Sequence, residues 1–130
     1  MPQIYVILSS PRAERMYCPG QAIDTFLHSL FPIVEQRFGI EGKNDVAMTV
    51  IEARRTTNEA DIQMEIRYTA GEDEYGTGQP FDPSVEVQRE LIEEIGAMFT
   101  ATAGVKNSAP PLKLSVWCKP HYHSVFKSFG

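Results

Sequence analysis

The N-terminal stretch carries the longest hydrophobic run among the predicted strands. Pro2 and Gln3 are followed by an unbroken apolar run from Ile4 to Leu8 that is rich in β-branched residues. Such a run predicts a core strand buried on both faces, whereas a strand with one wet face would alternate apolar and polar residues. Proline is tolerated as the first residue of a strand, because its missing N–H costs no ladder hydrogen bond there. We therefore expect a strand that Pro2 opens.

Three further strands are predicted later in the chain. Apolar residues alternate with small or polar ones in two stretches, which is typical of strands with one face on the core. The apolar positions are Val46, Met48 and Val50, in a strand running to about Ala53, and then Ile62, Met64, Ile66 and Tyr68, which alternate with Gln63, Glu65 and Arg67. Pro110-Pro111 leads into Leu112, Leu114 and Val116, which predict the last strand.

Two helices are predicted between these strands from apolar residues at helical spacing. The first follows Pro19-Gly20, carries Ile23, Phe26, Leu27, Leu30, Val34 and Phe38, and should kink at Pro32 and end at Gly39. The second should begin with Asp82 as N-cap and Pro83 at the first helical position, and end at Gly104. Its predicted apolar face consists of Val87, Leu91, Ile95, Met98, Phe99 and Thr102.

Polar segments and turn residues separate these elements. We expect a loop over Ser9-Ser10-Pro11-Arg12, a turn over Gly42-Lys43-Asn44-Asp45 and a polar connection over Thr56-Thr57-Asn58-Glu59. The stretch from Gly71 to Phe81 is acidic and glycine-rich and predicts a long loop. Its glycines do not form a phosphate cradle, since the acidic residues would repel phosphate and the spacing does not match a nucleotide motif.

The predicted element order is βαβ followed by a second βαβ, which indicates an α+β fold in one domain over residues 1–130. Each parallel strand pair needs a crossover helix, and that crossover should be right-handed. Two architectures fit this order. One places two tandem βαβ units around a mixed four-stranded sheet, and the other is the ferredoxin-like split βαβ. The hydrophobic pattern alone does not separate them.

Charge and composition narrow the function classes. A net charge of −5 argues against nucleic acid as the main partner, and it means that locally clustered cations would have to bind any anionic substrate. Cys18 and Cys118 have no metal-type spacing and are interpreted as ordinary thiols in a reducing cytosol. The first apolar run is short and lacks a basic lead-in, and no stretch reaches transmembrane length. We therefore expect a cytoplasmic protein without a membrane partner.

The C-terminal tail contains two histidines around a tyrosine, His121-Tyr122-His123. They could ligate a metal if the segment is extended, but no third ligand cluster is evident in the sequence, so a surface or interface tail is the favoured interpretation. Trp117 and Phe126 are interpreted as packing residues that could also wall an apolar pocket.

The residue with the clearest chemical potential is Pro2. If Met1 is removed, Pro2 carries a free secondary amine, and a free α-amine has a reference pKa of about 7.7–8.0. Burial disfavours the cation and lowers that pKa further, which suits a general base near neutral pH. The alternative is that Pro2 only begins a strand.

Five features spread along the chain add to this N-terminal pattern. They are Met1-Pro2 before an apolar strand, Pro19-Gly20 before the first helix, Ala70-Gly71 after the third strand, Leu112-Lys113-Leu114-Ser115 in the last strand and Ser124-Val125-Phe126-Lys127 in the tail. With them the chain resembles the tautomerase superfamily, nearest the 5-carboxymethyl-2-hydroxymuconate isomerase branch and then the macrophage migration inhibitory factor branch. The resemblance implies the tandem βαβ fold, a homotrimer, and cofactor-independent keto–enol isomerisation of a small, carboxylate-bearing enol or unsaturated keto acid with Pro2 as base.

The resemblance also implies substrate-binding positions. Arg12 stands where short tautomerases have a carboxylate-binding arginine, although a solvated loop arginine fits it equally well. Lys43 resembles a lysine that precedes strand two in the migration inhibitory factor branch. Tyr68 in the third strand is a further candidate, and Lys113 and Ser115 lie on the last strand, which in the family can reach a neighbouring subunit's pocket.

Two departures from the muconate isomerase branch bear on the substrate. Glu72-Asp73 and Asn44-Asp45 stand where that branch has arginines, so its carboxylate clamp is not reproduced. Arg54 or Arg55 could supply a cation instead. The polar set Gln63, Glu65 and Arg67 could line the wet centre of a trimer. Two alternatives stay open: a non-catalytic small-molecule-binding or oligomerisation module, and a tautomerase fold that has lost activity.

Overall fold

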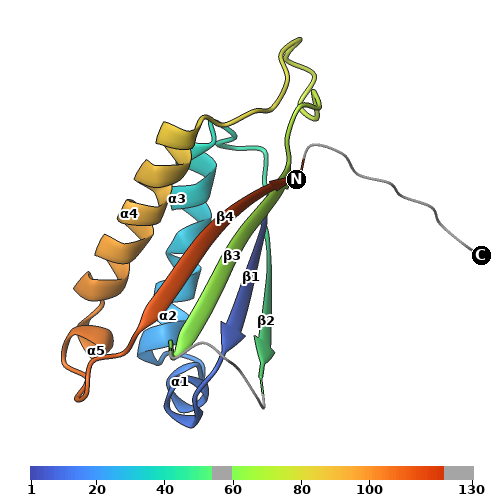
Figure 1. Ribbon diagram of the computed structural model, residues 1–130. Coiled ribbons are helices and arrows are strands. Elements are labelled where there is room, and N and C mark those ends of the chain that lie inside the picture. Colours follow the sequence, from blue (N-terminus) through green and yellow to red (C-terminus); the bar gives the residue numbers. More distant parts are fainter. Residues whose placement is uncertain (54–59, 122–130) are drawn as a thin grey trace, which may run out of the picture.

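A four-stranded sheet with helices on one face forms the body of the protein, as the computed structural model shows for residues 1–53 and 60–121 (Figure 1). The elements in chain order are β1 (Gln3–Leu8), α1 (Pro11–Met16), α2 (Ala22–His28), α3 (Leu30–Arg37), β2 (Ala47–Glu52), β3 (Ile62–Thr69), α4 (Val85–Ala101), α5 (Ala103–Lys106) and β4 (Leu114–His121). The predicted connection over Thr56–Glu59, the candidate cations Arg54 and Arg55, and the tail from Tyr122, including Phe126, lie outside the described residues.

The strand order decides between the two architectures. The sheet order is β2-β1-β3-β4, in which β1 pairs parallel with β2, β3 pairs parallel with β4, and β1 and β3 form an antiparallel pair at the centre. A split βαβ would separate the two strands of each parallel pair by another strand, whereas here they are direct neighbours. The tandem βαβ arrangement in a mixed sheet is therefore confirmed, and the ferredoxin-like alternative is wrong.

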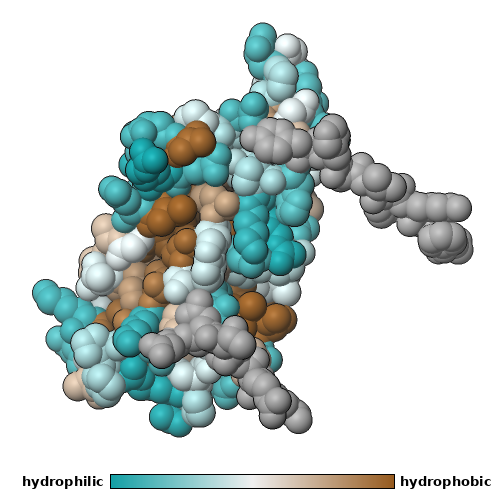
Figure 2. All heavy atoms as spheres, in the orientation of Figure 1, coloured by the Kyte–Doolittle hydropathy of each residue, from teal (hydrophilic) through white to brown (hydrophobic). Residues whose placement is uncertain are grey.

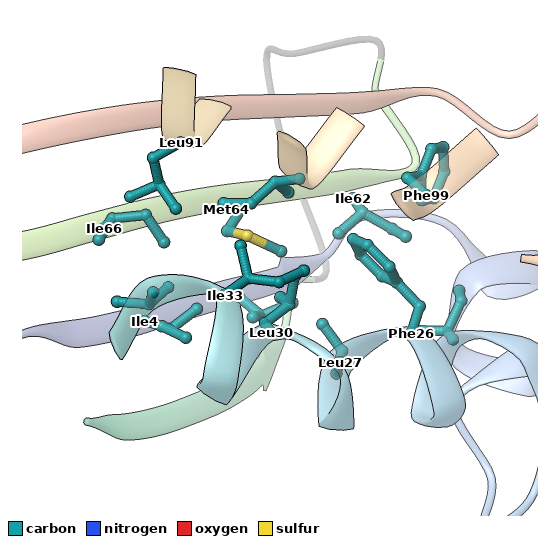
Figure 3. Packing of buried hydrophobic residues seen from close by; sticks show 14 of the residues in the cluster. Ile4, Phe26, Leu27, Leu30, Ile33, Ile62, Met64, Ile66, Leu91 and Phe99 are labelled. Carbon is teal, nitrogen blue, oxygen red and sulfur yellow. The ribbon is translucent and has the colours of Figure 1, made fainter. Parts of the chain in front are cut away.

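The core lies between one face of this sheet and helices α2, α3 and α4. Ile4, Val6 and Leu8 of β1 are fully buried, as are Ile62, Met64 and Ile66 of β3. Figure 3 shows Ile4 and Met64 facing Leu30 and Ile33 of the helical layer. The rings of Phe26 and Phe99 meet edge-to-face at 5.2 Å and tie α2 to α4. The alternation predicted for Ile62 to Tyr68 is confirmed, since all four apolar residues are buried.

No helix formed by residues 1–53 or 60–121 lies on the other face of the sheet (Figure 1). Strand register puts Gln3, Tyr5 and Ile7 on this open face together with Glu65 and Arg67 of β3. The three β1 residues are only half-buried. The prediction that β1 is buried on both faces is therefore wrong for the single chain, because the helices all cover one side.

Helix α1 was not predicted, and the loop expected over Ser9 to Arg12 is wrong. Ser10 is extended and its hydroxyl accepts a 3.1 Å hydrogen bond from the N–H of Ala13, which caps the helix. Pro11 occupies the first helical position, where its fixed φ suits the helix and its missing N–H costs nothing. The same serine and proline that indicate a loop thus form a helix start.

The first predicted helix is present as two helices, α2 and α3, separated at Ser29. Pro32 lies in the first turn of α3, where its ring and missing N–H prevent a continuous helix through the preceding turn. The expected kink is therefore a break. Gly39 adopts φ +67°, with hydrogen bonds from its N–H to the carbonyl of Gln36 and from Ile40 N–H to the carbonyl of Glu35. This Schellman pattern confirms the predicted helix end.

Helix α4 begins later than predicted. Ser84, and not Asp82, is the N-cap, because its hydroxyl accepts a 3.2 Å hydrogen bond from Val87 N–H. The helix ends where Thr102 adopts an extended conformation, two residues before the predicted stop. Leu91, Ile95 and Phe99 form the buried face, whereas Met98 is 37% exposed, so its assignment to the apolar face is wrong.

Strand β4 begins at Leu114, so Leu112 precedes it and does not belong to the strand as predicted, and the strand extends beyond Val116 to Pro120 and His121. A proline is acceptable in this strand because β4 lies at the edge of the sheet. None of the helices among the described residues is long and apolar enough to span a bilayer.

Two glycines give a matched test of the helical layer. A Cβ on Gly104 of α5 would overlap the Cβ of Ala22 in α2, whereas a Cβ on Gly96 of α4 would meet open space. We expect Gly104→Ala to lower the free energy of unfolding by about 1–3 kcal/mol through overpacking. Gly96→Ala should raise it by about 0.5–1 kcal/mol through helix propensity. Urea unfolding followed by circular dichroism measures both, and equal effects would contradict the packing of α5 on α2.

Candidate functional site

Pro2 lies at the end of the sheet where β1 and β2 begin and β3 and β4 finish. It is buried, and its carbonyl accepts a 3.2 Å hydrogen bond from Ala47 N–H at the start of β2. Gln3 is opposite Arg67 in the antiparallel pair, so extending this register by one residue places Pro2 opposite Tyr68. Two neighbouring strands therefore fix the position of Pro2.

An open cavity of about 390 Å³ lies beside this end of the sheet. It is lined by Met1, Gln3, Arg67, Tyr68, Thr69, Glu74 and His121. Figure 1 shows the N-terminus next to the end of β4 and below the loop that follows β3. The volume is within the usual range of small-molecule sites.

Arg67 supplies a permanent positive charge to this cavity. Its Nε donates a 2.7 Å hydrogen bond to Glu65, and its guanidinium lies 4.2 Å from the centre of the Tyr5 ring. Lys119 of β4 also donates to Glu65, at 2.7 Å. The hydrogen bond from Lys119 is the main reason that the pKa of Glu65 lies below its usual value; burial opposes the shift and Arg67 adds to it. These contacts hold the arginine in place on the open face.

The loop from Gly71 to Phe81 is anchored at both its turn and its base. Asp73 accepts hydrogen bonds of 2.9 Å from Thr77 N–H and 2.7 Å from Gly78 N–H, and backbone bonds join Gly71 and Glu72 to Phe81. Aromatic rings complete the anchor: Phe81 contacts Phe38, Tyr68 and Tyr75 edge-to-face, with centroids 5.5–5.7 Å apart. We call Phe38, Tyr68, Tyr75 and Phe81 the aromatic cluster.

Glu74 of this loop reaches the N-terminus, where its carboxylate forms an ion pair with the Met1 ammonium. Burial lowers the pKa of the Met1 amine below its usual value, and the carboxylates of Asp45 and Glu72 oppose that shift. Burial, with the nearby Asp45 adding to it, raises the pKa of Tyr75. The N-terminal amine is thus partly desolvated among several carboxylates.

Two of the predicted substrate-binding residues lie at this end of the sheet. Lys43 is exposed in the turn before β2, and its N–H bonds to the carbonyl of Ile40. Tyr68 is 2% exposed and belongs to the aromatic cluster, with its ring 5.0 Å from Phe38. Tyr68 also lines the cavity.

The other three predicted residues, Arg12, Lys113 and Ser115, lie toward the opposite end of the sheet. The five residue steps of β1 separate the two ends by roughly 17 Å. Ser115 is opposite Gln63, near the start of β3. Within one chain these residues therefore do not meet Pro2, and they could join its site only from a neighbouring subunit.

Arg12 is bound by residues at its own end of the sheet. It bonds to Asp61 at 3.3 Å and to the carbonyls of Pro110 and Pro111. Asp61 also accepts a 2.9 Å hydrogen bond from Lys113 N–H. Burial would raise the pKa of Asp61, but the bond from Lys113, with Ser10 and Arg12, outweighs it and holds the pKa below its usual value. Arg12 thus joins α1 to the segment before β4.

The remaining candidates from the sequence are His121 and its neighbours, the two cysteines and Trp117. His121 is exposed and lines the cavity, while Tyr122 and His123 lie outside the described residues. Within the described ranges no group of three or more potential metal ligands is found. Cys18 and Cys118 are free thiols, and burial raises the pKa of Cys118 to about 11, which makes it a poor nucleophile. Trp117 is 39% exposed, so its interpretation as a packing residue is wrong for the single chain, but it does line a groove between α4 and β4, as its second interpretation predicted.

Sequence reasoning missed Arg67 and Glu74 as site residues. Arg67 was assigned to a polar strand face, and only strand register shows that it is opposite Gln3, next to Pro2. Glu74 was part of an acidic loop. Its signal was the pair of aromatic residues, Tyr75 and Phe81, which a loop extending freely into solvent would not need.

Comparisons with known proteins give little further guidance. No protein-family model matches the chain, and no curated protein matches it significantly. Among solved structures, it is similar to a protein named "Q0 fused 4-OT wild type symmetric trimer", with 15% identity and a TM-score of 0.48 over 91% of this chain and 85% of that one. A likeness this distant supports no inference about activity or assembly, so function has to follow from the residues themselves.

Proposed function

We propose that the protein, once Met1 is removed, is a cofactor-independent keto–enol tautomerase with the Pro2 amine as general base. The observation that carries the proposal is the place of Pro2: it is buried directly before the central strand β1, between Met1 and Gln3, and both of these neighbours line the cavity together with Arg67 and Glu74. Desolvation at this position favours a neutral amine near pH 7, the form that a base requires. The resemblance of the sequence to tautomerases agrees with this assignment.

The reaction needs only a proton shuttle. The lone pair of Pro2 takes a proton from the enol hydroxyl or from a carbon next to the carbonyl, and the nitrogen becomes a secondary ammonium. The ammonium then returns the proton to the other end of the conjugated system, so the ketone forms and the amine is regenerated. The rigid ring fixes the direction of the lone pair, which contributes to orientation.

The charges around the cavity restrict the substrate. Among the described lining residues, Arg67 is the side chain with a permanent positive charge, and Glu74 adds a negative one. Arginine suits a carboxylate through its planar fork. We therefore propose a small enol or unsaturated keto acid with one carboxylate, bound by Arg67, with Lys43 at the same end of the sheet. Two carboxylates would place the second one near Glu74.

A specific observation keeps a non-catalytic form in view. In the unprocessed chain the Pro2 nitrogen is an amide without basicity, and the Met1 ammonium lines the cavity next to Glu74. Such a chain would be a tautomerase-like fold without activity or a small-molecule-binding module. The intact mass of the purified protein separates the catalytic form from the non-catalytic form, because Pro2 has a free amine only after Met1 is lost.

The open face of the sheet supports the proposal of a homotrimer. Fully parallel sheets are usually covered on both faces. Here, within the described ranges, no helix covers the face with Tyr5 and Ile7, and Ile51, opposite Ile7 in β2, is 49% exposed. A ring of subunits needs two different complementary surfaces. Each sheet edge has a groove. One lies between α4 and β4 and is lined by Ile92, Val116 and Trp117 together with charged residues of α4 (Figure 2). The other lies beside β2, where Phe31, Met48 and Val50 line it together with Asp24 and His28.

Replacing the proposed base is the first test. We expect Pro2→Ala in processed protein to lower kcat/KM for phenylenolpyruvate roughly 100-fold or more, since a positioned base contributes on that scale. Some activity should persist, because an N-terminal amine is still present. Pro11→Ala, which alters a proline of α1 without an amine role, should keep the activity. Wild-type rates in Pro2→Ala, or no activity of processed wild-type protein on phenylenolpyruvate or hydroxymuconates, would refute the catalytic role.

We expect substitution of Arg67 to change substrate binding and substitution of Arg12 to change stability. Arg67→Ala should raise KM for a carboxylate-bearing enol more than it lowers kcat, as expected for a group that binds substrate and transition state alike. Arg12→Ala should leave KM unchanged and instead lower the melting temperature, because it breaks the contacts with Asp61 and the Pro110 and Pro111 carbonyls. Steady-state kinetics and thermal unfolding on both variants measure this. The reverse pattern would return Arg12 to the site, from a neighbouring subunit.

Assembly can be tested on the open face. Ile51→Glu should convert the trimer to monomers in light scattering at micromolar concentration, since a carboxylate without a partner is costly in a buried interface. Met98→Glu places the same charge on the exposed side of α4 and should leave the trimer intact. A wild-type protein that is monomeric, or an Ile51→Glu trimer, would contradict the proposed use of this face.

A further inference from the structure

Resting on the proposed function, we propose that Glu74 is a positioning residue of the Pro2 site, the counter-ion that holds the protonated N-terminal amine and sets the pH at which it becomes a base. The first support is direct contact: the Glu74 carboxylate is ion-paired with the N-terminal ammonium of the unprocessed chain. Glu74 also lines the cavity, with a side chain that is 20% exposed.

The second support is that the fold fixes Glu74 from both sides along the chain. On one side, Asp73 accepts hydrogen bonds from Thr77 and Gly78 N–H and so closes the turn of the loop. On the other side, Tyr75 packs its ring 5.5 Å from Phe81 in the aromatic cluster. A residue between two such anchors cannot drift far from the N-terminus, so the geometry of the contact belongs to the fold.

The third support is that the Glu74 side chain is long enough to contact the Pro2 amine after Met1 is removed. Removal of Met1 moves the amine by one residue along the chain, a step of about 4 Å. Pro2 cannot follow Met1 outward, because its carbonyl is bound to Ala47 N–H and its ring is buried. A glutamate side chain covers a step of this length by a change of rotamer. The carboxylate that pairs with the Met1 ammonium can therefore pair with the Pro2 ammonium.

Among the residues that the structure describes, several charged and titratable groups lie around the cavity beside the amine, and together they influence its pKa. They are Asp45 from the turn before β2, Glu72, Glu74 and Tyr75 from the loop, Arg67 from β3 and His121 from β4. Arg67 is already engaged by Glu65, which reduces its effect on the amine. Burial favours the neutral amine, and a carboxylate within about 4–6 Å favours the cation. Asp45 and Glu72 raise the pKa of the Met1 amine from a distance. Glu74 is the carboxylate in direct contact with the ammonium, so we expect its removal to change the pKa of the Pro2 amine most.

The experiment is a pH series on processed Glu74→Gln, with two readouts. An anion raises the pKa of a neighbouring amine, so its removal should lower the pKa of Pro2 by about one unit. The ascending limb of kcat/KM, which reports the base of the free enzyme, should move to lower pH by the same amount. At a pH below both values, kcat/KM should rise up to roughly tenfold, while the plateau at high pH stays at or below that of the wild type.

The second readout does not need activity. The pH dependence of labelling at the N-terminal amine by an amine-reactive reagent, followed by mass spectrometry, gives the pKa of Pro2 directly. Lysines titrate near 10.4 and are distinguished by peptide mapping. Glu74→Asp keeps the charge at a shorter reach and should give an intermediate value. Glu86→Gln removes the same charge from an exposed ion pair with Arg89 on α4 and should give the wild-type value.

The outcomes separate this inference from the proposed function. A labelling pKa lowered in Glu74→Gln supports the inference, even if no enol is isomerised, in which case the tautomerase proposal alone fails. Unchanged pH profiles in an active Glu74→Gln enzyme overturn the inference and leave the tautomerase proposal standing. A rise in KM without any pH shift also overturns it, since that is what a loop with a merely structural role would produce.

Discussion

The pairing of β1 with both of its neighbours is the constraint on which the site depends. Ile4, Val6 and Leu8 are fully buried under the helices, and a slip of one residue in register would turn all three to the open face. That penalty locks β1 against β2 and β3. Because Pro2 directly precedes this strand, the burial of apolar residues up to six positions away fixes where the N-terminal nitrogen lies.

Most of the fold could be predicted because its signals are local. The alternation from Ile62 to Tyr68 and the helix end at Gly39 each depend on a few neighbouring residues and on local backbone geometry. The predictions of helix starts were wrong where the same residue type is common both in loops and at helix N-termini. Ser10-Pro11 ends a strand and begins a helix, and Asp82 and Ser84 compete as caps until the hydrogen bond to Val87 decides.

The site could be predicted only in part, because it depends on which elements become neighbours. Pro2 is visible in the sequence since its chemistry follows from its position at the terminus. Arg67 is not, because it lies 64 positions after Gln3 in the chain and only the antiparallel register brings the two together. Arg12 shows the opposite case: an arginine near Pro2 in sequence is carried by β1 to the far end of the sheet, where Asp61 and two carbonyls bind it.

The fold places two opposing effects on one nitrogen. Burial lowers the pKa of the Met1 amine, and the carboxylates of Asp45 and Glu72 oppose this shift. Under the proposed function, the same two effects act on the Pro2 amine once Met1 is removed. In the proposed reaction, burial alone would make the amine too weak a base to hold the proton between the two steps. The carboxylates alone would keep the amine protonated, so that it could not accept a proton. A shuttle requires both steps, and Brønsted behaviour favours a pKa close to the working pH. The acidic residues of the loop would repel a phosphate, but they are compatible with the proposed proton shuttle because their charge acts on the N-terminal amine.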